Sequence, residues 1–559
     1  MKIDEFSTLN ELFSLAIERY RRLIALKLAK PKAEDEEPPK HAYHETSYGE
    51  LGELAERFSG ALAELGLEKG DRVAILAKPC LEWQVALWGA LRLGAIVVPI
   101  DTELTPPEIE RILRESGAKA LIAGGGGRLL DKDKIERAVA GHEIKIAHSI
   151  RMGEPFWKLL EGKEPAPPPP AEVHPEDLAL IVYTSGTTGN AKGVMLSHHN
   201  LASNVRAFLP RLDVSSKDVI LSIIPWHHIF GFTATILAPL AVGATLIYTD
   251  DYKSIPRMML QNGVTILVGV PKLFHAMFQR IEERLAHGGL KARLVYRFFP
   301  RLAGRVLRKR LTGKAFRFII SGGAPLDPRV IRGFRRLGLG VIEGYGLSET
   351  SPVLTFSTPF NRKAGSVGPP VPGVEIKILD PDDQGIGEVL VRGPNVMQGY
   401  YKNPTRTEEV LDPEGWFHTG DLGRLDRDGW LYLHGRRKNV IVLESGKNVY
   451  PEEVEFELGK IPYIQEVLVK RGFRGGKEVV QALIYPDWER LGERGLSEAD
   501  VEGVKELIWE EIALRQRELA PYKRIKSRED LIILSEPFEK TSKQDIKRCI
   551  TQPNANSAD

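Results

Sequence analysis

The feature that most constrains the fold is a repeated alternation of helix-like and strand-like apolar patterns. From Leu51 to Leu65, apolar residues recur at the spacing of an amphipathic helix, and Arg72–Ala77 then forms a short apolar run. The cycle repeats with a helical pattern over Trp83–Leu93 and an apolar run over Ala95–Ile100. Helices that alternate with buried strands are typical of α/β layers around largely parallel sheets. The pattern therefore predicts an α/β fold.

One uncharged stretch, Ile229–Tyr248, has the twenty residues that a membrane crossing requires. It contains Gly231, Pro239 and Gly243, and it ends in the β-like run Ala-Thr-Leu-Ile-Tyr. A buried helix followed by a buried strand explains this pattern better than a membrane span. We therefore expect the stretch to lie in the core.

Composition and termini limit the function classes. The 559 residues carry 77 Lys and Arg against 75 Asp and Glu, so nothing in the overall charge suggests a nucleic-acid partner. Two cysteines, Cys80 and Cys549, cannot make a disulfide framework or a cysteine zinc site, and they fit a reducing compartment. The acidic start resembles no signal peptide, and the last residues match no retention or peroxisomal signal. These features predict a cytoplasmic protein.

The most informative motif directly follows an apolar run. Leu178–Tyr183 has the pattern of a strand and leads into Thr-Ser-Gly-Thr-Thr-Gly-Asn-Ala-Lys-Gly at residues 184–193. Three glycines allow tight turns, while four hydroxyls and the Lys192 ammonium complete a cradle for an anion. The segment lacks the Gly-Lys-Ser/Thr ending of the P-loop. A polar surface turn is the alternative, but so many hydroxyl and lysine groups beside glycines after a buried strand disfavour it.

This loop resembles the phosphate loop of the adenylate-forming superfamily, which includes acyl-CoA synthetases, nonribosomal-peptide adenylation domains and beetle luciferases. Further motifs follow in the family's order: Pro225–Gly231, Ser321–Pro325, Glu343–Thr350, Trp416–Asp421 and Gly435–Ile441. The His-His-Ile-Phe-Gly element and the run Ser445–Glu455 look closest to the fatty acyl-CoA synthetase branch. The resemblance implies a large N-terminal domain of layered α/β sheets with a small β-barrel-like subdomain, followed by a small mobile α+β C-terminal domain.

The resemblance also implies a domain organisation and two half-reactions. Residues 1–434 would form the AMP-binding domain, residues 435–438 a hinge with Lys438, and residues 439–559 the small domain. In the family the small domain rotates between formation of acyl-AMP with release of pyrophosphate and attack of a thiol on the acyl-AMP. ATP, Mg²⁺ and CoA are the cofactor and co-substrates that this implies.

Individual roles follow from the same resemblance. The phosphates of ATP would lie against Thr184, Ser185, Gly186, Thr187, Thr188, Gly189 and Lys192. The adenosine would lie against Gly322, Gly323, Ala324, Glu343, Gly344, Tyr345, Gly346, Ser348, Asp421 and Arg436. Glu349 would ligate Mg²⁺, which prefers carboxylate and phosphate oxygens. His228 would lie at the mouth of the acyl pocket, whereas His227 is expected to be structural. Lys192, His228 and Glu349 are thus candidate catalytic residues.

The last motif of the family is altered in this chain. The family has a lysine four residues after a threonine, and that lysine contacts the reacting carboxylate and α-phosphate. Counting from Thr541, this position holds Asp545, with Lys543 and Lys547 two residues to either side. In an extended segment, residues two apart share a face, so a long lysine side chain can partly recover the position. Lys547 is our candidate for the role, while Lys543 or a weak adenylation step are the alternatives.

A basic segment lies between Lys272 and Arg317, with thirteen Lys and Arg against two Glu. Arg293, Arg297, Arg301 and Arg305 recur every fourth residue with apolar neighbours one step along, which predicts an amphipathic basic helix interrupted near Pro300. Such a helix suits peripheral contact with an anionic membrane, an acidic carrier or the phosphates of CoA. A solvated helix packed on the core is the alternative.

The leading hypothesis from the sequence is ATP-dependent activation of a medium- to long-chain fatty acid and its transfer to CoA. A second hypothesis hands the acyl group to the phosphopantetheine of a carrier protein. A third is a binding protein with weakened catalysis, because of Asp545. A hydrolase finds no support, since the chain lacks a Gly-x-Ser-x-Gly elbow and a second histidine after His44-Glu45 for a zinc helix.

Overall fold

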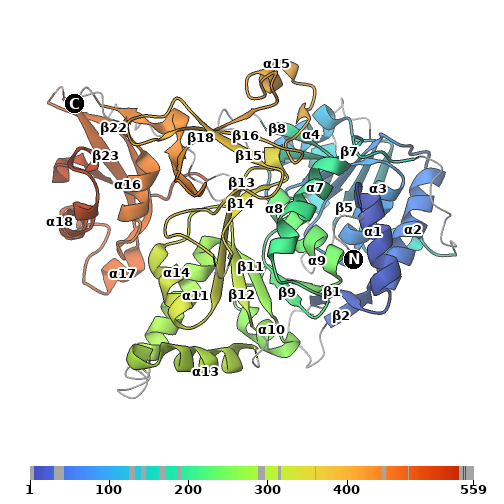
Figure 1. Ribbon diagram of the computed structural model, residues 1–559, viewed down its shortest axis with the longest axis horizontal. Coiled ribbons are helices and arrows are strands. Elements are labelled where there is room, and N and C mark those ends of the chain that lie inside the picture. Colours follow the sequence, from blue (N-terminus) through green and yellow to red (C-terminus); the bar gives the residue numbers. More distant parts are fainter. Residues whose placement is uncertain are drawn as a thin grey trace.

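Two large sheets form the N-terminal domain in this computed structural model, and a small C-terminal domain lies to one side (Figure 1). The structure describes residues 6–29, 43–124, 132–139, 146–162, 172–184, 191–287, 296–312, 316–358, 361–443, 448–475, 477–540, 546 and 548. The mixed α/β architecture confirms the fold class predicted from the sequence.

The first large sheet has seven strands. Their order is β17 (Gly399–Tyr400), β8 (Lys192–Ser197), β7 (Leu178–Thr184), β4 (Ile96–Ile100), β3 (Arg72–Leu76), β5 (Ala120–Ala123) and β6 (His148–Arg151). The strands from β7 to β6 run parallel, and β8 is antiparallel to β7. The three apolar runs predicted as strands are therefore neighbours in one sheet.

The second large sheet has eight strands. Their order is β14 (Val353–Phe356), β13 (Gly340–Gly346), β12 (Phe318–Ser321), β11 (Ile266–Gly269), β9 (Val219–Ser222), β10 (Thr245–Tyr248), β1 (Ile24–Ala29) and β2 (Tyr43–Ser47). Only the two edge strands, β14 and β2, pair in the antiparallel direction.

Helices cover the two sheets. They are α1 (Leu9–Tyr20), α2 (Tyr48–Glu64), α3 (Leu81–Arg92), α4 (Pro106–Ser116), α5 (Lys132–Val139), α6 (Glu154–Lys158), α7 (His198–Phe208), α10 (Ile255–Asn262), α11 (Pro271–His287), α13 (Pro300–Thr312) and α14 (Pro328–Arg336). The two predicted helices are α2 and α3. Helix α2 begins three residues before the predicted Leu51 because the Ser47 hydroxyl accepts a hydrogen bond from the Glu50 backbone amide and caps the helix.

The uncharged stretch Ile229–Tyr248 is core, as predicted. It consists of α8 (Ile229–Gly231), a π-helix (Phe232–Leu237), α9 (Ala238–Val242) and strand β10. Most of its apolar side chains are buried. Among the described helices, none combines the length and apolarity that a bilayer crossing needs.

A third sheet completes the N-terminal domain. It is a four-stranded antiparallel sheet of β15 (Glu375–Leu379), β16 (Gly387–Arg392), β18 (Phe417–Leu425) and β19 (Leu431–Arg436), with α15 (Pro404–Glu408) in the connection. It corresponds to the small β-barrel-like subdomain expected from the sequence. Strand β19 leads through a 3₁₀ turn (Arg437–Asn439) into the C-terminal domain.

The C-terminal domain has a core of its own. Its elements are β20 (Ile441–Val442), β21 (Asn448–Val449), α16 (Pro451–Leu458), β22 (Ile464–Arg474), β23 (Lys477–Pro486), α17 (Trp488–Gly492), α18 (Val501–Arg515) and β24 (Leu531–Ile533). Apolar side chains from 441 to 531 form one buried cluster, separate from the main cluster of the N-terminal domain. Figure 1 shows α16 on the side of this domain that faces the four-stranded sheet, and α16 packs against β19.

Candidate active site

The motifs of the sequence meet at the carboxyl ends of strands from both large sheets. Thr184 ends β7, Ser321 ends β12 and Gly346 ends β13. The ring of Phe230, in α8, lies against Gly322, where an added Cβ would come within 2.9 Å of the ring. Ligands of α/β sheets bind at this edge of the strands, so the fold itself gathers the motifs into one candidate site.

The first cluster in this site joins Lys192, Tyr400 and Glu349. The Lys192 ammonium lies 4.8 Å from the centre of the Tyr400 ring, and the Tyr400 hydroxyl donates a hydrogen bond of 2.9 Å to Glu349 Oε1. Tyr400 reaches this position because β17 pairs with β8, where Tyr400 lies opposite Val194, two residues after Lys192. Burial lowers the pKa of the Lys192 ammonium, as does the charge of Arg406, while Glu349 acts in the opposite direction.

This cluster has the donor set for a magnesium nucleotide. Mg²⁺ binds through one or two carboxylates and completes its octahedron with phosphate oxygens and waters. The Glu349 carboxylate, oriented through one oxygen by Tyr400, would supply such a ligand. Lys192, at the start of β8, would supply a positive charge for the phosphates. The residues therefore fit the Mg²⁺ and ATP expected from the sequence.

The second cluster joins Tyr345, Asp421 and Arg436. The Tyr345 hydroxyl donates to Asp421 Oδ2 at 2.6 Å, and Arg436 Nε lies 2.7 Å from Asp421 Oδ1. Asp421 and Arg436 are direct partners in the pairing of β18 with β19. Burial raises the pKa of Asp421 against the charge of Arg436, and the charge of Glu349 raises it further. That influence places the two clusters within electrostatic reach of each other.

Glycines in the adenosine motifs allow close packing and an unusual backbone conformation. A Cβ on Gly346 would lie 1.7 Å from the Pro352 carbonyl oxygen, and Gly323 has a φ of +87°. Only glycine suits either position. A Cβ on Gly344 would lie 3.2 Å from the Thr355 carbonyl oxygen, and Ser348 is buried. Ala324 follows these glycines in the turn after β12.

Glu343 lies on β13 among the proposed adenosine contacts. Its carboxylate is 3.6 Å from the Arg362 guanidinium. Burial raises the pKa of Glu343 to about 7 despite that positive charge. Its backbone is held by Ser357, whose amide donates to the Glu343 carbonyl oxygen at 2.9 Å.

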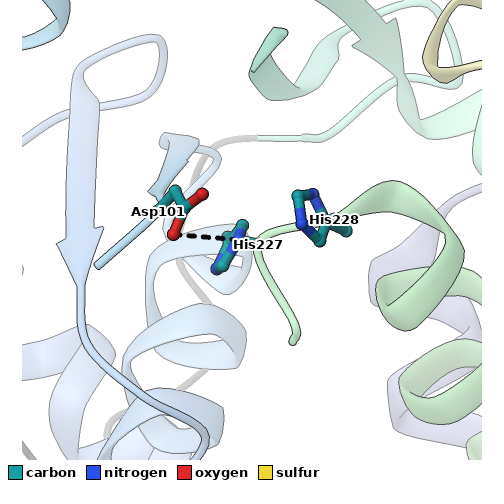
Figure 2. Close-up of side chains that lie close together, drawn as sticks. All are labelled: Asp101, His227 and His228. Atoms are coloured by element: carbon teal, nitrogen blue, oxygen red, sulfur yellow. Dashed lines mark ion pairs between the residues drawn. The ribbon is translucent and has the colours of Figure 1, made fainter. Parts of the chain in front are cut away.

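His228 is the residue that precedes α8, and its neighbour His227 faces Asp101 (Figure 2). His227 Nε2 lies 3.4 Å from Asp101 Oδ1, and the rings of His227 and His228 are in contact with centroids 4.2 Å apart. Asp101 directly follows β4, so this cluster links the carboxyl ends of the two large sheets. The segment of His228 continues to Phe230 and so to Gly322 of the adenosine motif.

Several predicted site residues lie outside the part of the chain that the structure describes. They are Ser185, Gly186, Thr187, Thr188, Gly189 and Lys547, together with Lys543 and Asp545. The flanking Thr184 and Lys192 are paired across β7 and β8. Lys438 lies in the 3₁₀ turn between the domains. The binding and catalytic roles of all these residues remain predictions.

Sequence reasoning missed Tyr400, Arg362, Phe230 and Asp101. Tyr400 had a weak signal, the Gly-Tyr-Tyr run at 399–401, but nothing in the sequence pairs that run with Lys192. Arg362 and Phe230 act through tertiary contacts that follow no local pattern. Asp101 follows a predicted strand end, which is the one sequence signal that could have drawn attention to it.

Comparison with known proteins identifies the family. Residues 23–401 match the family described as AMP-binding enzyme, and residues 438–554 match the family described as AMP-binding enzyme C-terminal domain. A long-chain-fatty-acid–CoA ligase of Escherichia coli O157:H7 is 31% identical over 461 residues, covering 75% of this chain and 77% of that protein. A long-chain-fatty-acid–CoA ligase of Mycobacterium bovis is 31% identical over 498 residues, covering 82% of each chain.

Solved structures agree with this relationship. A Mycobacterium tuberculosis fatty acyl CoA synthetase superposes with a TM-score of 0.68 at 26% identity, covering 97% of both chains. ATP-bound MatB from Rhodopseudomonas palustris superposes with a TM-score of 0.75 at 26% identity, covering 96% of this chain and 97% of the other. Bacillus subtilis O-succinylbenzoate CoA synthetase, 23% identical with a TM-score of 0.74, shares the fold. With both family domains present in the family's order, this chain belongs to the AMP-binding enzymes.

Proposed function

We propose that this chain is an AMP-forming acid–CoA ligase that activates a medium- to long-chain fatty acid. The family and its relatives support the coarser statement, an adenylate-forming acid–CoA ligase that uses ATP, Mg²⁺ and CoA. The fatty acid is the finer proposal, supported by two relatives named for long-chain fatty acids at 31% identity. Because O-succinylbenzoate CoA synthetase shares this fold, the fold alone leaves the acid open.

The observation that carries the proposal is the pair of clusters at the carboxyl ends of the strands. Attack of a carboxylate on the α-phosphorus of ATP brings two anions together, so the protein must neutralise and align them. Lys192 offers a positive charge, and Glu349, oriented by Tyr400, offers a carboxylate ligand for Mg²⁺. A magnesium ion held there would neutralise phosphate charge. Asp421, held by Tyr345 and Arg436, is oriented to accept hydrogen bonds from ribose hydroxyls.

The second half-reaction is assigned to the same site after a domain rotation. We place the hinge at residues 435–438 with Lys438, the large domain at 1–434 and the mobile small domain at 439–559. Support comes from the separate apolar core of the small domain, whose first member is Ile441. Lys547 is proposed to take the place that Asp545 occupies in the altered last motif.

The test is pyrophosphate release from ATP with a panel of carboxylic acids, with and without CoA, for the wild type and Asp545→Lys. We expect release with C12–C18 acids and conversion to the thioester with CoA. Activity with short or aromatic acids alone would refute the fatty-acid proposal while keeping the ligase. Release only by Asp545→Lys would mean that the native protein is a weakened homologue that binds acid and nucleotide.

A carrier protein is the alternative acceptor of the acyl group. The same assay distinguishes it, because turnover with a phosphopantetheinylated carrier protein but not with CoA would favour the carrier. Thioester formation with CoA at rates that match pyrophosphate release would favour the ligase as proposed.

We further propose that the enzyme contacts an anionic membrane through a docking face made by α10, α13 and the residues that precede them. The sequence predicted a basic helix interrupted near Pro300. Helix α13 begins at Pro300, after the helical residues 296–298, and it packs against α10. Of the eleven large apolar side chains exposed in the described part of the chain, six lie here: Tyr252, Leu260, Phe298, Phe299, Leu302 and Val306. Exposed cations lie among them: Arg257, Arg297, Arg301, Arg305 and Lys309.

Charge complementarity favours an anionic lipid surface as the partner of this docking face. Neither 252–262 nor 296–312 contains an acidic residue, and Figure 1 shows α13 at the outer edge of the N-terminal domain. Exposed aromatic and aliphatic side chains between arginines suit insertion among lipid headgroups. Each basic residue near an anionic surface contributes about 1 kcal/mol.

Vesicle sedimentation tests the docking face. We expect binding to phosphatidylglycerol-containing vesicles and not to pure phosphatidylcholine. Arg301→Glu/Arg305→Glu should weaken binding at least about tenfold, and Phe298→Ser/Phe299→Ser should also weaken it, with acid activation of detergent-solubilised substrate unchanged. Phe473→Ser, an exposed phenylalanine on β22, is the matched control. Equal binding by the wild type and both double variants would refute the docking face.

A further inference from the structure

The cluster of Asp101, His227 and His228 has no part in the function derived above beyond the expected position of His228. The three side chains come from different elements: Asp101 directly follows β4, and the histidines lie in the turn between β9 and α8. Figure 2 shows Asp101 and His227 facing each other with His228 beside His227. One ligand atom from each of the three side chains lies within 4.8 Å of the other two.

Buried Asp101 Oδ2 lacks a hydrogen-bond partner in this cluster. His227 Nε2 makes no hydrogen bond beyond its 3.4 Å ion-pair contact with Asp101 Oδ1, and the two side chains are 8% and 9% exposed. The other oxygen of Asp101, Oδ1, accepts from the Glu103 backbone amide at 2.9 Å, which fixes the carboxylate. An unsatisfied buried polar atom costs about 1–3 kcal/mol, so a bound water or ion is the expected explanation for both.

The donor set favours a metal ion over a water. Two imidazoles and one carboxylate form the ligand set of zinc sites that keep an open fourth position. Ligand atoms around tetrahedral Zn²⁺ lie about 3.3 Å apart, given bonds of about 2.0 Å. The contact of His227 Nε2 with Asp101 Oδ1, at 3.4 Å, is already at this separation, and a ligand atom of His228 lies within 4.8 Å of both. Mg²⁺ prefers oxygen ligands, so the imidazoles distinguish this site from the nucleotide metal.

We propose that Asp101, His227 and His228 form a binding site for a divalent transition-metal ion of the Zn²⁺ class, separate from the magnesium of ATP. The ion would tie the carboxyl end of β4 to the turn that carries His228. That turn reaches Phe230, whose ring lies against Gly322, so the ion would fix the position of the segment beside the adenosine motif. The metal-site proposal is argued from these side chains alone, so its test does not depend on which acid the enzyme activates.

Metal titration of the tag-free full-length protein tests the proposal. After removal of metals and in excess Mg²⁺, Co²⁺ should bind at one ion per chain with visible absorption bands, and Zn²⁺ should displace it. Asp101→Asn and His227→Gln should each weaken Zn²⁺ binding at least about tenfold. His275→Gln, a histidine on α11 outside the cluster, should bind as the wild type does. Absence of saturable binding, or unchanged affinity in both cluster variants, would overturn the site.

A measurement on the wild type guards against variants that fail to fold. X-ray absorption of the Zn²⁺-loaded protein should show two imidazole nitrogens and oxygen in the first shell. A shell with sulfur or without imidazole would place the ion elsewhere and overturn the proposal. Unfolding temperatures with and without Zn²⁺ should differ for the wild type and His275→Gln, and coincide for Asp101→Asn.

Discussion

Tyr400 connects the phosphate side of the site to its proposed metal ligand. Its ring lies under the Lys192 ammonium, and its hydroxyl donates to Glu349. A hydrogen bond to a charged acceptor contributes about 1.5–3 kcal/mol, and here it also fixes the direction of the carboxylate. On the proposed role of Glu349, Tyr400 would act on Mg²⁺ through that carboxylate, as a positioning residue.

Tyr400→Phe should therefore raise the Mg²⁺ concentration for half-maximal pyrophosphate release about tenfold, because the loss of about 1.4 kcal/mol in positioning is a factor of ten. The ring still covers Lys192, so the fold and the KM for the acid should change little. Tyr401→Phe is the control, since the Tyr401 hydroxyl lies 3.4 Å from the Ser116 carbonyl oxygen, away from Glu349. An unchanged Mg²⁺ dependence in Tyr400→Phe would contradict this role.

The raised pKa of Glu343 predicts that the stability of the protein depends on pH. Burial raises its pKa from 4.5 to about 7, so between these values the folded state holds the proton more tightly than the unfolded chain. Stability must then fall as pH rises through this window, by about 3 kcal/mol at most. In urea titrations, the free energy of unfolding of the wild type should therefore fall between pH 5 and pH 8 relative to that of Glu343→Gln. Parallel curves for the two proteins would show that Glu343 does not titrate in this range.

At the scale of elements, helices and strands were predictable where their apolar period was clear. Helix α2, strand β3 and the strand before the phosphate loop fall close to where the pattern put them. Contacts between elements were not predictable. Strand β17 is two residues long and meets β8 across some two hundred residues of sequence, so Tyr400 had no local signal as a partner of Lys192. The docking face likewise could not be predicted from the basic segment alone, because part of it lies on α10, outside that segment.

Arg548 contacts both α16 and β22. Arg548 donates to Glu455 Oε2 at 2.5 Å and to the Val469 carbonyl oxygen at 3.2 Å. Burial raises the pKa of Glu455 to about 6, against the charge of Arg548. The same guanidinium lies 3.5 Å from Glu452. Arg548 directly follows Lys547, the candidate for the last motif.

Arg548→Ala should leave the Glu455 carboxylate without its counter-charge. Removing one partner of a fully buried ion pair lowers the free energy of unfolding by about 3–5 kcal/mol, and the loss should be smaller here because both side chains are partly exposed. The loss should be larger at pH 8, where Glu455 is ionised, than at pH 5. ATP binding should persist because its proposed contacts lie in the large domain, while pyrophosphate release should fall. Arg548→Lys should restore part of both properties. Wild-type stability and pyrophosphate release in Arg548→Ala would show that the Arg548 contacts are dispensable.

For the whole molecule, the relation of the two domains depends on a glycine at the end of β19. Gly435 has a φ of +153°, and a Cβ there would lie 2.6 Å from Glu452 Oε2 of α16. Glu452 also accepts from the Asn439 side chain at 2.5 Å, just after the proposed hinge. The α16 carboxylate thus closely approaches the end of β19 in the domain arrangement of Figure 1.

Gly435→Ala should disfavour this arrangement. Overpacking of this kind costs about 1–3 kcal/mol, so the balance between two domain arrangements should shift about tenfold. Since the two half-reactions are proposed to use different arrangements, the ratio of pyrophosphate release to acyl-CoA formation should change by a similar factor. Glu452→Ala removes the atom that the new methyl group meets, while the φ of +153° strains an alanine in either background, so Gly435→Ala/Glu452→Ala should bring the ratio only part of the way back toward that of Glu452→Ala alone. If Gly435→Ala slows both half-reactions equally and the second substitution restores nothing, the contact is a packing detail, and the hinge must lie elsewhere.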